Sequence, residues 1–137
     1  MNDLEVEAER IKRLSGRHAT RERRDLISQA LSSKWEGTQA LAIAILAEWG
    51  DRQSIQAIQT FLEAAFTRKY GWAIRGVAIR ALAPALTADD SDWLGRLSRS
   101  PVTELKRHEL RPLIERLAAL KMTVQSAPLG HSDLKIP

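Results

Sequence analysis

One stretch of the sequence recurs after 36 residues. Residues 79–83 read Ile-Arg-Ala-Leu-Ala, residues 43–47 read Ile-Ala-Ile-Leu-Ala, and Ala42 and Ala78 keep the same register. A weaker copy, Ile-Glu-Arg-Leu-Ala, follows at residues 114–118. A period of this length is typical of stacked helical hairpins, which form extended binding surfaces more often than active sites. The repeat therefore points to a helical scaffold first and to a binding role second.

Hydrophobic periodicity predicts helices along nearly the whole chain. No segment of the sequence shows the sustained period-two alternation that is typical of a β-strand. The predicted helices cover residues 4–14, 20–31, 39–49, 52–68, 72–86, 91–99 and 101–122. We therefore expect an all-α protein of about six or seven helices, with one domain over residues 1–122 and a flexible tail over residues 123–137.

Individual residues predict where these helices begin, bend or end. Gly50 is expected to end a helix, because glycine accepts the left-handed backbone conformation found there. Thr38 and Asp51 are expected to cap the helices that follow them by accepting from free backbone N–H groups. Proline lacks a backbone donor, so Pro84 should kink or end its helix and Pro112 should bend the last one.

The segment 72–83 carries a more specific pattern. An aliphatic residue precedes an arginine, an alanine follows three positions later, and an alanine-leucine pair comes next; the residues are Ile74, Arg75, Ala78, Ala81 and Leu82. This pattern resembles the first helix of a HEAT repeat of the bacterial lyase-like type. The resemblance implies a right-handed α-α superhelix of helical hairpins. A compact helical bundle would show the same amphipathicity and remains the alternative.

The resemblance also implies a polar contact between neighbouring repeats. In HEAT proteins an arginine of one repeat and a turn aspartate of another often form a ladder. By resemblance, Arg75 and Asp51 are the candidates in this chain.

Motifs of catalysis are missing from the sequence. It contains no cysteine, its three histidines lack metal-ligand spacing, and it has neither a glycine-rich phosphate loop nor a Gly-x-Ser-x-Gly motif. We therefore expect no enzyme activity, no metal and no cofactor. The start lacks a secretory signal, and the longest apolar run, residues 40–47, is far shorter than a membrane span. A soluble cytoplasmic protein without a membrane partner is expected.

Basic and aromatic residues gather in the second half of the chain. The net charge is +4, yet residues 26–67 hold two basic and four acidic side chains, whereas residues 68–111 hold nine basic and five acidic ones. A positive field of this kind attracts anionic partners. The candidate partner-binding residues are Arg68, Lys69, Tyr70, Trp72, Arg75, Arg96, Arg99, Lys106, Arg107 and Arg111. The competing interpretations are a solvated face for the charges and core packing for the tryptophans.

Two classes of function follow from these features. The leading hypothesis is a non-enzymatic bacterial protein-binding module for a partner with an acidic surface. Its role could be that of an adaptor, an enzyme-assembly helper, or an inhibitor such as a toxin-neutralising immunity protein. The alternative is nucleic-acid binding, since the resemblance extends loosely to helical-repeat alkylpurine DNA glycosylases. Those enzymes use an aspartate beside tryptophans, and the sequence places none beside Trp72. A relationship to tetrapyrrole lyases rests on the repeat type alone.

Overall fold

The computed structural model describes residues 3–122, so the tail expected at 123–137 lies outside the described residues. Within residues 3–122 every regular element is a helix and no strand is present, which confirms the all-α class. The chain forms two compact units, residues 1–85 and 86–137, and each unit is described by itself. A right-handed superhelix of hairpins stays a prediction.

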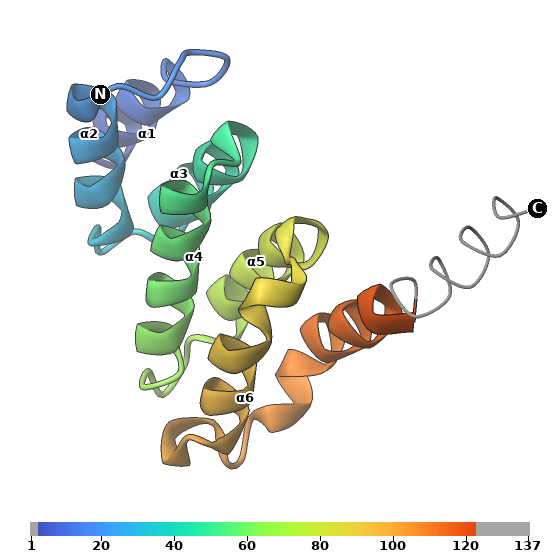
Figure 1. The fold of residues 1–137 in the computed structure, drawn as a ribbon. Coiled ribbons are helices and arrows are strands. Elements are labelled where there is room, and N and C mark those ends of the chain that lie inside the picture. Colours follow the sequence, from blue (N-terminus) through green and yellow to red (C-terminus); the bar gives the residue numbers. More distant parts are fainter. Residues whose placement is uncertain (1–2, 123–137) are drawn as a thin grey trace, which may run out of the picture. The chain divides into compact units, whose positions relative to one another are not determined.

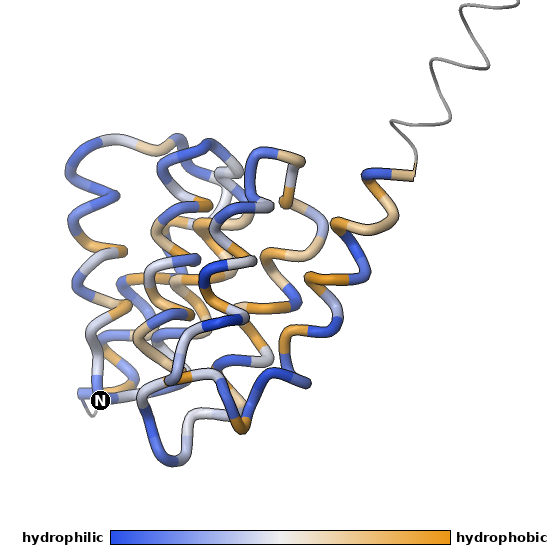
Figure 2. Tube along the Cα trace, turned by 60° about the horizontal axis from the view of Figure 1, so that its bottom comes forward, coloured by the Kyte–Doolittle hydropathy of each residue, from blue (hydrophilic) through white to orange (hydrophobic). Residues whose placement is uncertain are grey.

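Unit 1 (residues 1–85) is built around one central helix. Its α-helices, labelled in Figure 1, are α1 (Asp3–Lys12), α2 (Arg21–Leu31), α3 (Glu36–Trp49), α4 (Arg52–Ala65) and α5 (Trp72–Leu82). Helix α3 contacts all four others, as expected for a helix that is apolar on nearly every side. Apolar positions recur along each helix in Figure 2 and supply this core. Helices α1, α3 and α5 contact one another in sequence order, and α4 packs on both α3 and α5.

The joint between α3 and α4 is two residues long. Gly50 has a φ of 67° and donates its backbone N–H to the Leu46 carbonyl, which confirms the predicted left-handed helix end. Asp51 occupies the N-cap position of α4, but its carboxylate accepts no capping hydrogen bond from the helix. The capping role predicted for Thr38 is wrong. Because α3 begins at Glu36, Thr38 lies inside its first turn and is completely buried.

Proline shapes the end of α5 as expected. The α-helix ends at Leu82 and continues as a 3₁₀ turn over Ala83–Ala85, with Pro84 at its centre. Proline has no backbone N–H to donate to the carbonyl four residues earlier, so the α-helix cannot run on unchanged. The predicted helix end at Pro84 is therefore confirmed.

Unit 2 (residues 86–137) begins with a capped turn. The 3₁₀ turn η2 (Ala88–Asp90) is held by a capping box in which the Thr87 backbone N–H donates to the Asp90 carboxylate at 2.8 Å. Helix α6 (Ser91–Arg99) follows with the bounds that the sequence predicts. Ser100 then accepts from the Val102 N–H and begins the 3₁₀ turn η3 (Pro101–Thr103).

The last predicted helix is divided. A second 3₁₀ turn, η4 (Arg107–Leu110), precedes an α-helix over residues 111–122, so the expectation of one continuous helix from Pro101 is wrong. Pro112 lies in the first turn of the helix 111–122, where its missing N–H has no intrahelical acceptor to lose. Pro112 therefore begins this helix instead of bending a longer one. None of the described helices, in either unit, is long and apolar enough to cross a membrane.

Candidate binding surface

Closely packed residues hold the inner side of the turn between α4 and α5. Phe66 ends α4 and is 1% exposed. Gly71, at the N-cap of α5, is also buried, and a Cβ added to it would lie 3.0 Å from Arg75 Nη1 and 3.2 Å from the Ala65 carbonyl oxygen. Only glycine fits this close approach of backbone and side chain. The turn is thus held tightly on its inner side.

Arg68, the first of the predicted binding residues, faces inward. Its Nη1 donates to Gln39 Oε1 at 3.2 Å, and its guanidinium lies 5.2 Å from the centre of the Phe61 ring. Gln39 is itself buried and donates to the Ser33 carbonyl at 2.6 Å. Arg68 therefore ties the turn to the start of α3, with only part of its side chain left at the surface.

Arg75 is the clearest departure from the expected site. Its side chain is buried, its Nη1 donates to the Ala65 carbonyl at 3.1 Å, and its guanidinium lies 5.3 Å from the centre of the Phe66 ring. A guanidinium buried in this way stabilises the turn and is not accessible to a partner. The predicted partner-binding role of Arg75 is therefore replaced by a structural one.

The ladder predicted between Arg75 and Asp51 is also wrong. Asp51 pairs with Arg24 of α2, at 2.5 Å from Nη2, and accepts a short hydrogen bond from the Ser54 hydroxyl. Arg24 donates to Ser54 Oγ as well, at 3.0 Å. Asp51 therefore pairs with Arg24 of α2, because α2 packs against α3, the helix that ends at this turn.

The outer side of the α4–α5 turn exposes two aromatic rings. Tyr70 is 77% exposed and Trp72 is 72% exposed, the two largest exposed fractions among the large apolar side chains of unit 1. Lys69 is exposed and its Nζ lies 5.4 Å from the centre of the Tyr70 ring. Large exposed aromatic side chains are uncommon outside interaction sites.

Helix α5 adds a cation to the same face. Arg80 is exposed and lies two turns beyond Trp72, and its Nη1 is 3.2 Å from the position of a Cβ on Gly76. We call Lys69, Tyr70, Trp72 and Arg80 the α5 patch. Arg80 was missing from the predicted binding residues, although its spacing of eight positions from Trp72 places both on one helix face. The sequence has no acidic residue between Glu63 and Asp89, so the patch has no carboxylate of its own.

The other five predicted binding residues belong to unit 2. Arg96 and Arg99 are exposed on α6. Arg107 donates through Nε to the Ser98 carbonyl at 2.6 Å, and Arg111 Nε lies 3.5 Å from Glu115 Oε2. Lys106 is half-buried. These residues are therefore spread over α6, the 3₁₀ turns and the start of the helix 111–122, and Arg107 and Arg111 are engaged locally.

A second polar region of unit 1 surrounds the α3–α4 joint. Trp49 donates its Nε1–H to the Arg17 carbonyl at 2.7 Å, and the Arg24 guanidinium lies 5.5 Å from the centre of its ring. The Glu48 carboxylate accepts from the Ser15 hydroxyl and from the Gly16 backbone N–H. A cavity of about 350 Å³ opens between the loop that follows α1 and the α3–α4 joint. Its polar groups are largely engaged with one another, so the region fastens the loop after α1 to the end of α3.

Asp51 at this joint carries a perturbed acidity. The hydrogen bond from Ser54 lowers the pKa of the Asp51 carboxyl below its ordinary value of 3.8, and Arg24 adds to this effect through its hydrogen bond and its charge. Burial acts in the opposite direction and is outweighed. The Asp51 carboxylate is therefore stabilised in its charged form by the folded structure.

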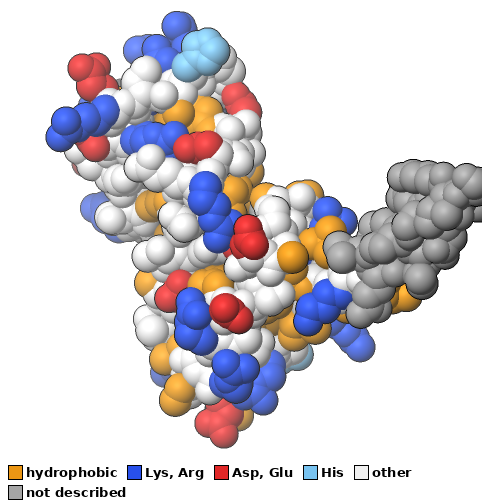
Figure 3. All heavy atoms as spheres, viewed as in Figure 1, with side chains coloured by type: hydrophobic (Ala, Val, Ile, Leu, Met, Phe, Trp, Pro, Cys, Tyr) orange, Lys and Arg blue, Asp and Glu red, His pale blue; other side chains and the backbone are white. Residues whose placement is uncertain are grey.

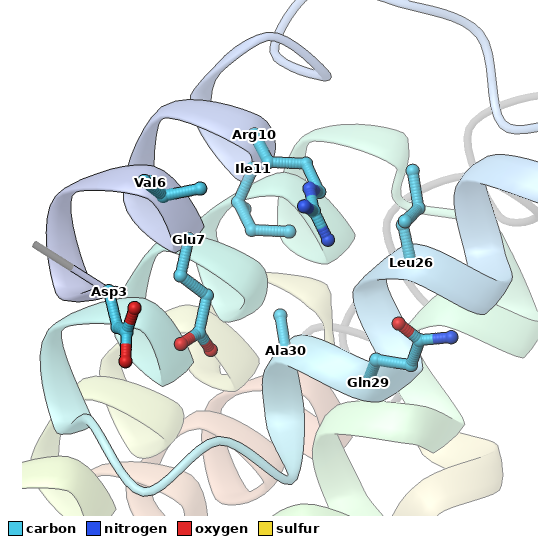
Figure 4. A pocket seen from close by; sticks show the side chains of 8 residues that line it. All are labelled: Asp3, Val6, Glu7, Arg10, Ile11, Leu26, Gln29 and Ala30. Carbon is cyan, nitrogen blue, oxygen red and sulfur yellow. The ribbon is translucent and has the colours of Figure 1, made fainter. Parts of the chain in front are cut away.

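A groove between α1 and α2 has mixed chemistry. It encloses about 280 Å³ and is lined on the α1 side by Asp3, Val6, Glu7 and Arg10 (Figure 4). On the face shown in Figure 3, basic and acidic side chains are interspersed around these two helices. Over residues 3–122, no group of three or more histidine or carboxylate side chains lies close enough to hold a metal ion. The groove therefore offers no concentrated charge of either sign.

Comparisons with family models, with curated proteins and with solved structures find no match to this chain.

Proposed function

We propose that this chain is a non-enzymatic protein-binding module of HEAT-like helical hairpins, and that the α5 patch contacts an acidic surface of its partner. The observation that carries the proposal is the exposure of Tyr70 and Trp72 on one turn, with Lys69 beside Tyr70 and the exposed Arg80 further along α5. Tryptophan, tyrosine and arginine supply most of the binding energy at protein interfaces. A solvated surface has no need of two such rings on one turn.

The charges of the α5 patch favour a partner with an acidic surface. Neither Lys69 nor Arg80 forms an ion pair with a carboxylate of the described chain, residues 3–122. Their charges are therefore available to steer an acidic partner and to fix its orientation. The turn that carries Lys69 and the two rings is held by Arg68 and Arg75, which lowers the cost of ordering its backbone on binding.

Photo-crosslinking in the producing cells tests this proposal. Benzoylphenylalanine replaces Ala73, which is exposed beside Trp72, and in the control it replaces Gln56, which is exposed on α4. We expect a protein adduct from position 73 that is absent from position 56. Adding Trp72→Ser or Lys69→Glu to the position 73 probe should remove the adduct. No adduct, or equal adducts from both positions, would refute the α5 patch as the binding surface.

Nucleic acid is the second candidate ligand, because exposed aromatic rings beside cations also suit base stacking and phosphate contact. Binding of mixed DNA and RNA oligonucleotides is measured at two salt concentrations. Affinity that falls steeply with salt and is lost in Trp72→Ala would replace the protein partner with a nucleic acid. We expect no salt-dependent affinity of this kind.

A further inference from the structure

Unit 2 carries an apolar groove that is separate from the α5 patch. The groove encloses about 370 Å³ between α6 and the helix 111–122. It is lined by Ser91, Leu94, Gly95, Ser98, Ile114, Leu117, Ala118 and Lys121. Lys121 is the only charged member of this set.

The lining residues form two matching stripes. On α6 they follow the spacing i, i+3, i+4, i+7 from residue 91, and on the last helix they follow the same spacing from residue 114. Each stripe is one face of about two helical turns, roughly 10 Å long. Two such ridges, one on each side of the groove, form a trough into which the ridge of a third helix can pack.

The sizes of the lining side chains suit a helix. Ala118 is small and exposed in the middle of its stripe, so another backbone can approach closely there. Leu94 and Leu117 form the buried floor, while Ile114 is 44% exposed at the edge. An amphipathic helix offers apolar residues at the matching i, i+3, i+4 and i+7 positions.

The basic residues around the groove favour an acidic occupant. Arg99 is exposed on α6, and its Nη1 lies 3.2 Å from the position of a Cβ on Gly95, which lines the groove. No carboxylate of the described residues forms an ion pair with Arg99 or Lys121, and none lines the groove. A partner helix with glutamate or aspartate beside its apolar stripe would complement both cations.

We propose that this groove is a docking site for an amphipathic helix of a partner protein, with acidic residues flanking its apolar face. The site adds a second, chemically different interaction surface to the chain and does not depend on the α5 patch. It gives an extended hydrophobic contact in place of two exposed aromatic rings.

The test uses the full chain and two designed peptides of about 14 residues, roughly four helical turns. The first peptide has leucine and alanine at i, i+3, i+4 and i+7 with glutamates on both flanks, and the second has lysines in place of the glutamates. We expect the glutamate peptide to bind at least about tenfold more tightly by fluorescence anisotropy. It should shift the backbone amide signals of Gly95 and Ala118 in NMR spectra, leaving those of Tyr70 and Trp72 unchanged.

Two pairs of variants localise the binding. Ala118→Trp fills the trough and should lower the affinity at least about tenfold, whereas Ala119→Trp, also exposed but outside the groove, should leave it within about twofold. Arg99→Glu should weaken the glutamate peptide and favour the lysine peptide, whereas Arg96→Glu on the same helix should change neither by more than about twofold.

Three outcomes overturn the proposal. The first is no saturable binding of either peptide, and the second is equal binding to wild type and Ala118→Trp. The third is a dimer of this chain, seen by sedimentation velocity, that Ala118→Trp abolishes, because the groove would then belong to a second copy. The absence of any crosslink from position 73 in the otherwise unchanged protein would refute the α5 patch and leave these expectations unchanged.

Discussion

The two turns of α4 contrast in how they use the same residue types. At the α3–α4 joint, Trp49 donates to a backbone carbonyl and is covered by Arg24, and Arg24 pairs with Asp51. At the α4–α5 turn, Trp72 is 72% exposed and Lys69 lies over an exposed ring without a carboxylate partner. The first turn satisfies its polar groups within unit 1, whereas the second leaves its aromatic and basic groups to solvent.

The presence of one carboxylate can therefore decide whether the basic and aromatic groups of a turn are engaged within the fold or left exposed to solvent. An arginine that pairs with a partly buried aspartate is not available to a partner, since each charge is already satisfied by the other. A lysine on a stretch without acidic residues keeps its charge available.

The two tryptophans should give opposite phenotypes. Trp49→Ala should lower the free energy of unfolding by about 2–3 kcal/mol, because it removes packing and the hydrogen bond to Arg17. Trp72→Ala should change it by less than about 0.5 kcal/mol, yet weaken partner binding by about 2 kcal/mol. Urea denaturation and crosslink yield measure the two effects. Equal destabilisation by both variants would remove the contrast.

The glycines of the two turns should both resist substitution, for different reasons. Gly50→Ala should cost about 1–2 kcal/mol of unfolding free energy, because Gly50 adopts a left-handed conformation. Gly71→Ala should cost about 1 kcal/mol or more through crowding against Ala65 and Arg75.

A third glycine provides the control for both measurements. Gly37 lies in the first turn of α3, and a Cβ there would meet no atom within 4 Å. Gly37→Ala should therefore stabilise the protein by up to about 1 kcal/mol. Asparagine tolerates the left-handed conformation, so Gly50→Asn should recover part of the loss at position 50, whereas Gly71→Asn should recover none. Equal behaviour of the two asparagine variants would contradict these assignments.

The Arg24–Asp51 pair should contribute about 0.5–1 kcal/mol in a double-mutant cycle with alanine, since it is partly exposed to solvent. It should also depend on pH. The folded structure lowers the pKa of Asp51 below its ordinary value of 3.8, so this stabilisation is present above pH 3.8 and is lost as the pH falls through the folded-state pKa.

Acid titration of stability isolates this effect. The free energy of unfolding of the wild type should fall more steeply below pH 3.8 than that of Asp51→Asn, which cannot titrate at this position. Identical acid profiles for the two proteins would show that Asp51 is not stabilised by Ser54 and Arg24.

Lys69→Glu should have the smallest effect on the fold. The side chain is exposed and its interaction with Tyr70 is a single cation–π contact, so the free energy of unfolding should change by less than about 0.5 kcal/mol. Crosslinking to an acidic partner should nevertheless fall, and its salt dependence should weaken. Lys34→Glu is the matched control, because Lys34 also lies over a ring, that of Trp35, outside the α5 patch. A similar loss in both variants would point to net charge alone.

Much of the local structure followed from the sequence. Helix α6 has its predicted bounds, Gly50 adopts its predicted conformation and Pro84 ends α5, because each depends on nearby residues only. Of the predicted binding residues, Lys69, Tyr70 and Trp72 are exposed, whereas Arg75 is buried. The error in the last helix has a local cause too, since apolar spacing continues across residues 101–122 although the backbone forms 3₁₀ turns there.

The all-α class, the left-handed end of α3, the break at Pro84 and the clustering of aromatic and basic residues followed from the sequence alone, since periodicity, glycine and proline act over a few residues. The packing of the helices settles which arginine meets Asp51, why Arg75 is buried and why Trp72 is exposed whereas Trp49 is covered. These outcomes depend on which helices pack side by side. A charge or a ring has the same letter in either setting, and its neighbours across the fold decide whether it stabilises the protein or remains available for a partner.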